Sequence, residues 1–308
     1  MKRKITILTI AFLSSVLMCA NAFAAATGRC GDSITWTLDD SGNLTLSGSG
    51  EMWNNGYDDS PFKDYEIRKA TVKYGITSIG ESAFLGCRGM TELTLPNSVR
   101  SIGDGAFSGC SGLTELTLPN SVTRIGDCAF YGCTGLTELI LPNSVSSIGD
   151  IAFTYCSGLE KITVESGNSC YDSRDNCNSI IDTEFNTLIV GCKNSVIPNS
   201  VTSIGYYAFY GCSGLTELTL PDSVASIGDG AFICCSDLSK ITSLAEIPPM
   251  CGSGVFDRVN KTNCELIVPE GSVAAYKQAE VWNEFSNISG FSGVEVTVAG
   301  KTRKIVVE

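Results

Sequence analysis

Hydrophobic and polar positions alternate in one pattern that returns along most of the chain. In the unit 113–135, Leu116 and Leu118 point to one side of an extended segment, while Glu115 and Thr117 point to the other. A proline then ends the strand, because it has no N–H to donate to a neighbouring strand. Apolar residues return after the turn. Each unit therefore predicts a short strand followed by turns, with an apolar side that it cannot bury alone.

The unit recurs at a spacing of 23 residues. Each copy contains Ile-Gly, then Ala-Phe, then a cysteine three residues after the phenylalanine. The interval between Phe153 and Phe209 is 56 residues, which leaves room for one enlarged repeat. Stacked copies place parallel strands about 4.8 Å apart around a continuous core, so we expect a right-handed solenoid with short parallel strands and irregular turn returns. The phenylalanines of this ladder are Phe84, Phe107, Phe130, Phe153, Phe209 and Phe232.

The consensus Leu-x-x-Leu-x-Leu-Pro-x-Ser-Val-x-x-Ile-Gly-x-x-Ala-Phe-x-x-Cys resembles the BspA-like leucine-rich repeat of the Treponema pallidum type. Residues 30–50 resemble its N-terminal capping segment, and residues 268–277 with Trp282 resemble its C-terminal cap. The resemblance implies an exported or surface protein of a host-associated microbe. Some members are similar to adhesins that bind host matrix proteins. No catalytic residue set comes with the family.

The pattern predicts an ordered series of segments. Three basic residues, an apolar run and Ala22-Phe-Ala24 are typical of a signal peptide, expected at 1–24. The series continues with an N-terminal β cap (25–70), the 23-residue leucine-rich repeats (71–245) with a hairpin insertion in the enlarged repeat (165–193), a mixed C-terminal cap (246–290) whose helix is expected at 272–284, and a tail β-hairpin (291–308).

Composition and charge exclude several classes of function. The chain has 33 acidic and 21 basic residues, a formal net charge of −12 and no histidine. Without histidine there is no Ser-His-Asp arrangement and no imidazole metal site, and an acidic chain disfavours nucleic acid as a partner. We expect a non-enzymatic protein without cofactor or metal. We expect the mature chain to be a monomer. The signal peptide indicates a secreted or cell-surface protein, and no apolar stretch after it is long enough to span a membrane.

The cysteines fall into two groups. Those in the repeats are expected to be buried thiols, with disulfides between neighbouring coils as the alternative. Outside the repeat column, the disulfide candidates are Cys170 with Cys177, near the enlarged repeat, and Cys251 with Cys264, in the C-terminal cap.

The outward-facing positions of the strands offer two interpretations. They form a solvated face, or they form a binding face in which a partner neutralises a row of carboxylates. The enlarged repeat adds Tyr171 as a further contact, and Tyr206, Tyr207 and Tyr210 lie close together on one coil, as a contact patch or as packing. The strand positions are Glu92, Glu115, Glu138 and Glu217, with Lys161 and Lys240 at equivalent places, and Thr94, Thr117, Thr163 and Thr219.

The functional hypothesis is an adhesin-like interaction protein. Its partner would be a protein or glycan on host or neighbouring cells, held by many weak contacts along the strand face. The alternative is a self-associating structural component of the bacterial surface, in which the tail hairpin supplies a free edge.

Overall fold

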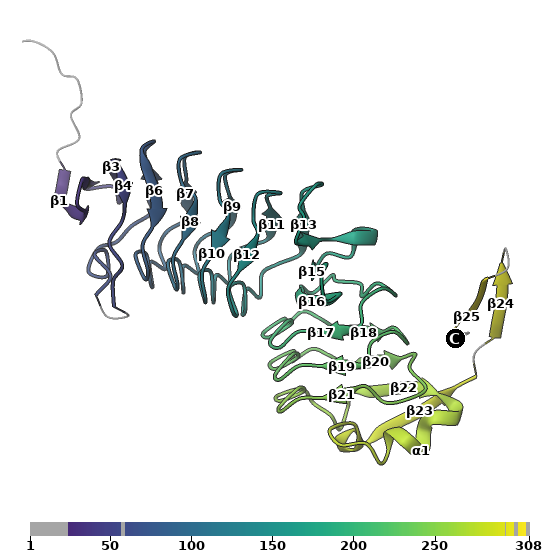
Figure 1. Cartoon of the computed structure of the whole chain (residues 1–308). Helices are drawn as coiled ribbons and strands as arrows, with labels where there is room; N and C mark the ends of the chain where they lie inside the picture. Colours follow the sequence, from purple (N-terminus) through teal and green to yellow (C-terminus); the bar gives the residue numbers. More distant parts are fainter. Residues whose placement is uncertain (1–23, 57–58, 293, 299–300, 306–308) are drawn as a thin grey trace, which may run out of the picture.

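The computed structural model describes residues 24–56, 59–292, 294–298 and 301–305. The expected signal peptide lies outside them, apart from Ala24. The chain is a solenoid in which each regular repeat adds two parallel strands, one to each of two stacks (Figure 1). The strands of the first stack are β3 (Asn43–Gly48), β5 (Lys69–Val72), β7 (Glu92–Thr94), β9 (Glu115–Thr117), β11 (Glu138–Leu141), β13 (Lys161–Val164), β18 (Glu217–Leu220), β20 (Lys240–Ser243), β22 (Glu265–Pro269) and β23 (Asn287–Phe291).

In the second stack, the strands of the regular repeats end at the isoleucine of Ile-Gly. Equivalent residues pair in register, as Ile102 does with Ile125 and Ile125 with Ile148. The strands are β4 (Gly50–Glu51), β6 (Ile76–Ile79), β8 (Ser101–Ile102), β10 (Arg124–Ile125), β12 (Ser147–Ile148), β17 (Ser203–Ile204), β19 (Ser226–Ile227) and β21 (Met250–Cys251).

Between the stacks, the phenylalanine of each Ala-Phe pair fills the core. Phe84 and Phe107 are fully buried and stack with ring centroids 5.0 Å apart, and Phe130 and Phe153 stack at 5.2 Å. The strand leucines and the isoleucines close the same core from the two sides. The column of apolar side chains predicted from the repeat therefore forms the hydrophobic core along the solenoid.

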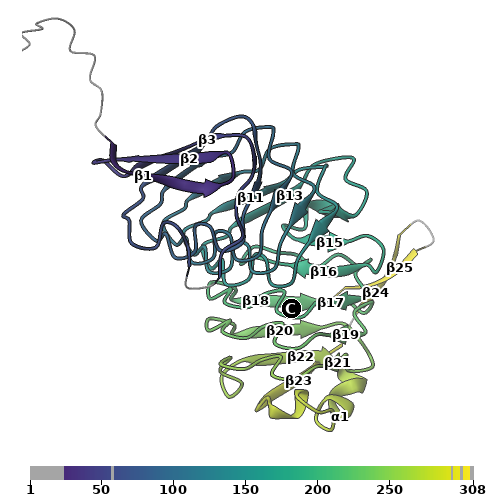
Figure 2. The ribbon, with the colours of Figure 1, turned by 60° about the vertical axis from the view of Figure 1, so that its left-hand side comes forward.

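The two ends of the solenoid are built differently. At the first, β1 (Ala24–Gly31) and β2 (Ile34–Asp39) form antiparallel pairs that lead to β3, which then pairs in parallel with β5 (Figure 2). At the other, Tyr276 and Trp282 are fully buried against the last coil. Beyond it, β24 (Val294–Val298) and β25 (Lys301–Ile305) pair antiparallel.

The prediction of one helix over residues 272–284 is wrong, because the α-helix in this segment is much shorter. That segment contains η2 (Glu270–Ser272), α1 (Val273–Tyr276) and η3 (Trp282–Glu284). Helix α1 ends at Tyr276, and Val281, whose φ is +69°, reverses the backbone directly before Trp282, which is buried in the core. In the described residues no helix is both long and apolar enough to cross a bilayer.

The enlarged repeat divides the solenoid into two limbs that meet at an angle (Figure 1). It contains β14 (Tyr171–Asp172), η1 (Arg174–Asn176), β15 (Ile180–Asp182) and β16 (Thr187–Val190), with β15 and β16 antiparallel as the insertion predicted. This repeat has no Ala-Phe turn, so the stacked rings stop at Phe153 and resume at Phe209. The buried residues accordingly form two clusters, one in each limb.

Candidate functional site

The carboxylates predicted as a binding row lie on the strand face of the first limb. Lys69 lies opposite Glu92 in register, and Glu115 lies opposite Glu138, which lies opposite Lys161. Lys69 Nζ is 2.6 Å from Glu92 Oε2, and Lys161 Nζ is 2.6 Å from Glu138 Oε1. The row is thus flanked by a lysine at each end, and its central Glu115 is exposed. Sequence reasoning missed Lys69, which precedes the first clear copy of the repeat.

The threonine row runs beside the carboxylates. Thr94 and Thr117 are exposed, and Thr163 is half-buried. Ile140 lies in register between Thr117 and Thr163 and remains 44% exposed, which places one apolar side chain in the middle of a polar row. This face therefore offers hydroxyl, carboxylate, ammonium and apolar groups side by side at the spacing of the strands.

The remaining predicted positions belong to the second limb. Glu217 lies opposite Lys240, which lies opposite Glu265, and Thr219 lies opposite Thr242. Glu217 and Thr219 are exposed, but the enlarged repeat separates them from the row on the first limb. The structure thus places the predicted residues on two strand faces.

The assignment of Tyr171 as a contact residue is wrong. Its side chain is 7% exposed, and its hydroxyl oxygen accepts the backbone N–H of Ile148 at 3.1 Å. Burial raises the pKa of this phenol. The ring covers the end of the first limb, where the regular core stops, so it is unavailable to a partner.

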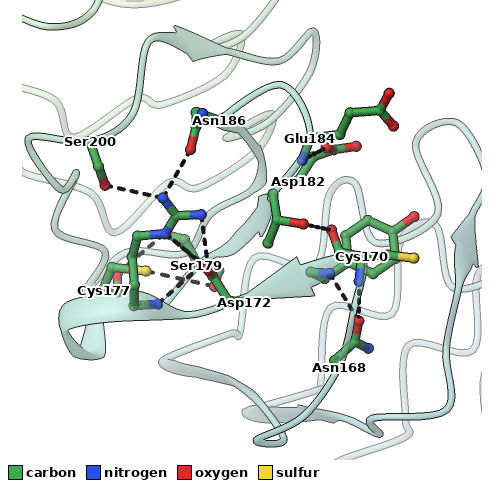
Figure 3. Close-up of polar contacts among 12 residues, drawn as sticks. Asn168, Cys170, Asp172, Cys177, Ser179, Asp182, Glu184, Asn186 and Ser200 are labelled. Atoms are coloured by element: carbon green, nitrogen blue, oxygen red, sulfur yellow. Dashed lines mark hydrogen bonds and ion pairs between the residues drawn. The ribbon is translucent and has the colours of Figure 1, made fainter.

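Polar contacts hold the segments of the enlarged repeat together (Figure 3). Arg174 Nε donates to Asp172 Oδ1 at 2.8 Å, and its NH1 donates to Asn186 Oδ1 at 2.9 Å. Asp182 Oδ1 accepts the N–H of Glu184 at 2.9 Å and thereby shapes the turn between β15 and β16. The insertion is therefore held in one arrangement by its own side chains.

The four disulfide candidates are free thiols in the structure, so neither expected pair is present. Cys177 is buried in the core of the second limb, whereas Cys170 packs against the core of the first. Cys251 lies in β21, in the second stack of strands, and Cys264 precedes β22, in the first stack. Cys170 and Cys177 therefore pack in different cores, whereas Cys251 and Cys264 pack in the same core from different sheets.

The repeat cysteines are buried thiols, as the preferred interpretation predicted. Those that follow Cys87 along the chain donate to a carbonyl oxygen of the preceding coil, as Cys110 Sγ does to Phe84 at 3.2 Å and Cys133 Sγ to Phe107 at 3.3 Å. Burial raises the pKa of Cys133 to about 12. These thiols are protonated and inaccessible, which makes them packing groups rather than nucleophiles.

A second surface is formed by the turns that contain the Ala-Phe pairs, and we call it the turn side. It lies on the inner side of the angle between the limbs (Figure 1). There the backbone N–H of Tyr155, from the first limb, donates to the carbonyl of Tyr210, from the second, at 3.1 Å. Tyr131 and Ile151, together with Tyr207 and Tyr210, line a groove with a volume of about 560 Å³. The sequence indicated that the second-limb tyrosines are clustered. It carried no signal that would place them against the first limb, because the enlarged repeat interrupts the period.

Comparisons with known proteins agree with this architecture. A family model described as "BspA type Leucine rich repeat region" matches residues 57–180 and 178–271, in 6 copies. A leucine-rich repeat protein from Eubacterium ventriosum is 24% identical, with 86% of this chain and 85% of that chain covered and a TM-score of 0.55. A search of curated proteins found no match.

Two further solved structures have the same fold. A leucine-rich cell surface protein from Faecalibacterium prausnitzii is 22% identical over 84% of this chain and 93% of that chain, with a TM-score of 0.53. The pneumococcal vaccine antigen PcpA is 16% identical over 81% of this chain and 83% of that chain, also with a TM-score of 0.53. At these identities the likeness concerns the fold.

Proposed function

The chain belongs to the BspA-type leucine-rich repeat family, and from this premise we propose that it is an adhesin-like interaction protein, secreted or displayed at the cell surface. Its partner is a protein or glycan on host or neighbouring cells. The observation that carries the proposal is the strand face of the first limb, where unlike polar groups are exposed in register on a repeating scaffold. Such a surface binds by summing many weak contacts.

One property of the face favours binding. The strand ladder holds the side chains on a rigid backbone, which lowers the entropy lost when a partner is bound.

The test is to reverse the charge of the row. We expect the triple variant E92K/E115K/E138K to bind its ligand about tenfold more weakly and with a smaller salt dependence, since each exposed charge contact contributes about 0.2–1 kcal/mol. The measurement is binding of the labelled protein to immobilised host matrix proteins and glycans at two salt concentrations.

The matched control is D40K/D222K/E280K, which makes the same change of net charge at exposed positions away from the row. If both triple variants lose affinity equally, the row is not the binding surface. If neither loses affinity, partners contact another face of the solenoid.

The second candidate function is self-association into a surface structure. It is favoured by the strand pair β24–β25, which continues the chain beyond the last coil. Sedimentation velocity over a range of protein concentrations separates the two functions: assembly without any added ligand supports self-association, and a constant monomer supports the adhesin-like role.

A further inference from the structure

A continuous groove follows the turn side of the solenoid and crosses the angle between the limbs. Its first part, with a volume of 620 Å³, is lined by Glu81, Asp104 and Asp127 and ends at Tyr131 and Ile151. The same Tyr131 and Ile151 line the second part, of 560 Å³, which continues onto the second limb. A groove of this length that is open to solvent suits a chain-like ligand better than a compact one.

Three tyrosines line the groove where the limbs meet: Tyr131 from the first limb, and Tyr207 and Tyr210 from the second. The rings of Tyr207 and Tyr210 are 5.7 Å apart. Tyr155, outside this lining, lies between Tyr131 and Tyr210, with ring centroids 6.2 and 5.5 Å from theirs. The faces of such rings carry partial negative charge and attract ammonium and guanidinium groups.

The carboxylates of the first part are held in a fixed orientation. The N–H of Asp127 donates to Asp104 Oδ1 at 3.0 Å, and the N–H of Asp150 donates to Asp127 Oδ1 at 2.9 Å. Both Asp104 and Asp127 are exposed, and neither takes part in the ion pairs found in the described part of the chain. The backbone thus occupies one oxygen of each carboxylate and leaves negative charge uncompensated at the groove.

One basic side chain reaches the groove at its far end. Arg258 lines the second part, beside Asp257, and its NH1 lies 3.8 Å from Cys234 Sγ. The first part has Glu81, Asp104 and Asp127 as its charged lining and no lysine or arginine. The charge that complements it is therefore positive.

We propose that this groove binds an extended peptide segment that carries lysine or arginine side chains. The carboxylates pair with the cationic groups, the tyrosine rings stack on them, and Leu85 and Ile151 contact the methylene stems. The site is on the turn side, whereas the row tested above is on the strand face. It is therefore a second binding site and does not depend on the first.

The probe is a fluorescein-labelled peptide of alternating arginine and glycine, and its anisotropy with the full-length protein is measured at two salt concentrations. The variant D104N/D127N removes two charges but keeps the side-chain oxygens that accept the backbone N–H groups. We expect it to weaken binding about tenfold. The control D40N/D222N makes the same change of net charge elsewhere and should change the affinity less than twofold.

A tyrosine pair tests the aromatic contribution. We expect Y207A to weaken binding about fivefold and Y74A, which removes a 79% exposed tyrosine outside the groove, to leave it unchanged. Circular dichroism confirms that each variant is folded. The strand-face variant E92K/E115K/E138K should retain peptide binding, which separates this proposal from the proposed function.

Three results would overturn the proposal. Equal losses in D104N/D127N and D40N/D222N would show attraction to the net charge of the protein alone. An equally tight complex with the peptide in which glutamate replaces arginine would exclude recognition of cations. Failure to bind the arginine peptide, together with binding of a neutral chito-oligosaccharide that Y207A abolishes, would identify the groove as a glycan site.

Discussion

At the scale of single residues, the repeat cysteines have a specific packing role. Each thiol is buried in the core that contains the phenylalanine ladder, and those after Cys87 donate to a carbonyl of the preceding coil, as Cys133 does to Phe107. Alanine would leave that space empty, and a charged thiolate would be buried without a partner. The column therefore stabilises the solenoid only while its thiols are protonated.

This role predicts an alkaline limit of stability. The pKa of Cys133 is raised from 9.0 to about 12 by burial, so the unfolded chain ionises at a lower pH than the folded one. The contribution of this thiol to the free energy of unfolding is complete below pH 9. It is lost as the pH rises toward 12, by about 1.4 kcal/mol per pH unit for each such group. Urea unfolding followed by circular dichroism at pH 8 and about pH 10.5 measures the decline.

Two variants check the assignment. Cys133→Ala should lower the free energy of unfolding by about 1–3 kcal/mol at neutral pH. It should also make the fall of this free energy with rising pH less steep, because one titrating thiol has been removed. Val122→Ala removes a fully buried apolar side chain of the same coil without removing a titrating group, so its decline should match the wild type. An unchanged slope in Cys133→Ala would contradict the protonated-thiol account.

At the scale of elements, the enlarged repeat ends one ladder of rings and starts another. Gly191 lies directly on the ring of Phe209, and a Cβ at Gly191 would be 2.2 Å from Phe209 Cε1. The backbone of this repeat thus takes the place that a phenylalanine ring occupies in the regular repeats, and only glycine allows that approach. The hydrophobic core of the second limb begins at this contact.

We expect Gly191→Ala to destabilise the protein by about 1–3 kcal/mol, because the added methyl group must displace a buried ring. The measurement is the free energy of unfolding in urea. Gly271→Ala is the matched control, since a Cβ at Gly271 meets nothing within 4 Å, and it should change the free energy by less than about 0.5 kcal/mol. Equal effects of the two substitutions would refute the role given to Gly191.

At the scale of the whole molecule, the protein has two hydrophobic cores in sequence. Contacts in a solenoid are mainly between neighbouring repeats, so a defect weakens the coils around it most. The break at the enlarged repeat should limit how far a defect spreads from one limb into the other.

Hydrogen exchange can test this independence. We expect Phe107→Ala, at a cost of about 3–5 kcal/mol, to reduce amide protection in the first limb more than in the second, and Phe232→Ala to do the reverse. The two substitutions are matched, since both rings are fully buried and both stack on their neighbours. Uniform loss of protection after either substitution would show that the limbs unfold as one unit.

The elements that the sequence predicted best are those with local causes. A strand pattern, a proline and a turn recur in each copy, so the solenoid, the ladder of phenylalanines and the exposure of Glu115 and Thr117 follow from one unit. The hairpin insertion was predicted for the same reason, from alternation around a turn. The errors at Tyr171 and in the disulfide candidates lie where the period is broken or ends.

The 23-residue period alone therefore determines which residues face the core, because each copy must bury the same apolar side against its neighbours. Tertiary structure decides what happens where copies cease to be equivalent. It buries Tyr171 over the end of the first core, closes the row of glutamates with Lys69, and brings Tyr155 against Tyr210 across the angle between the limbs. The contact between Tyr155 and Tyr210 joins residues whose separation is not a multiple of the repeat, and only the folded chain places these two rings together.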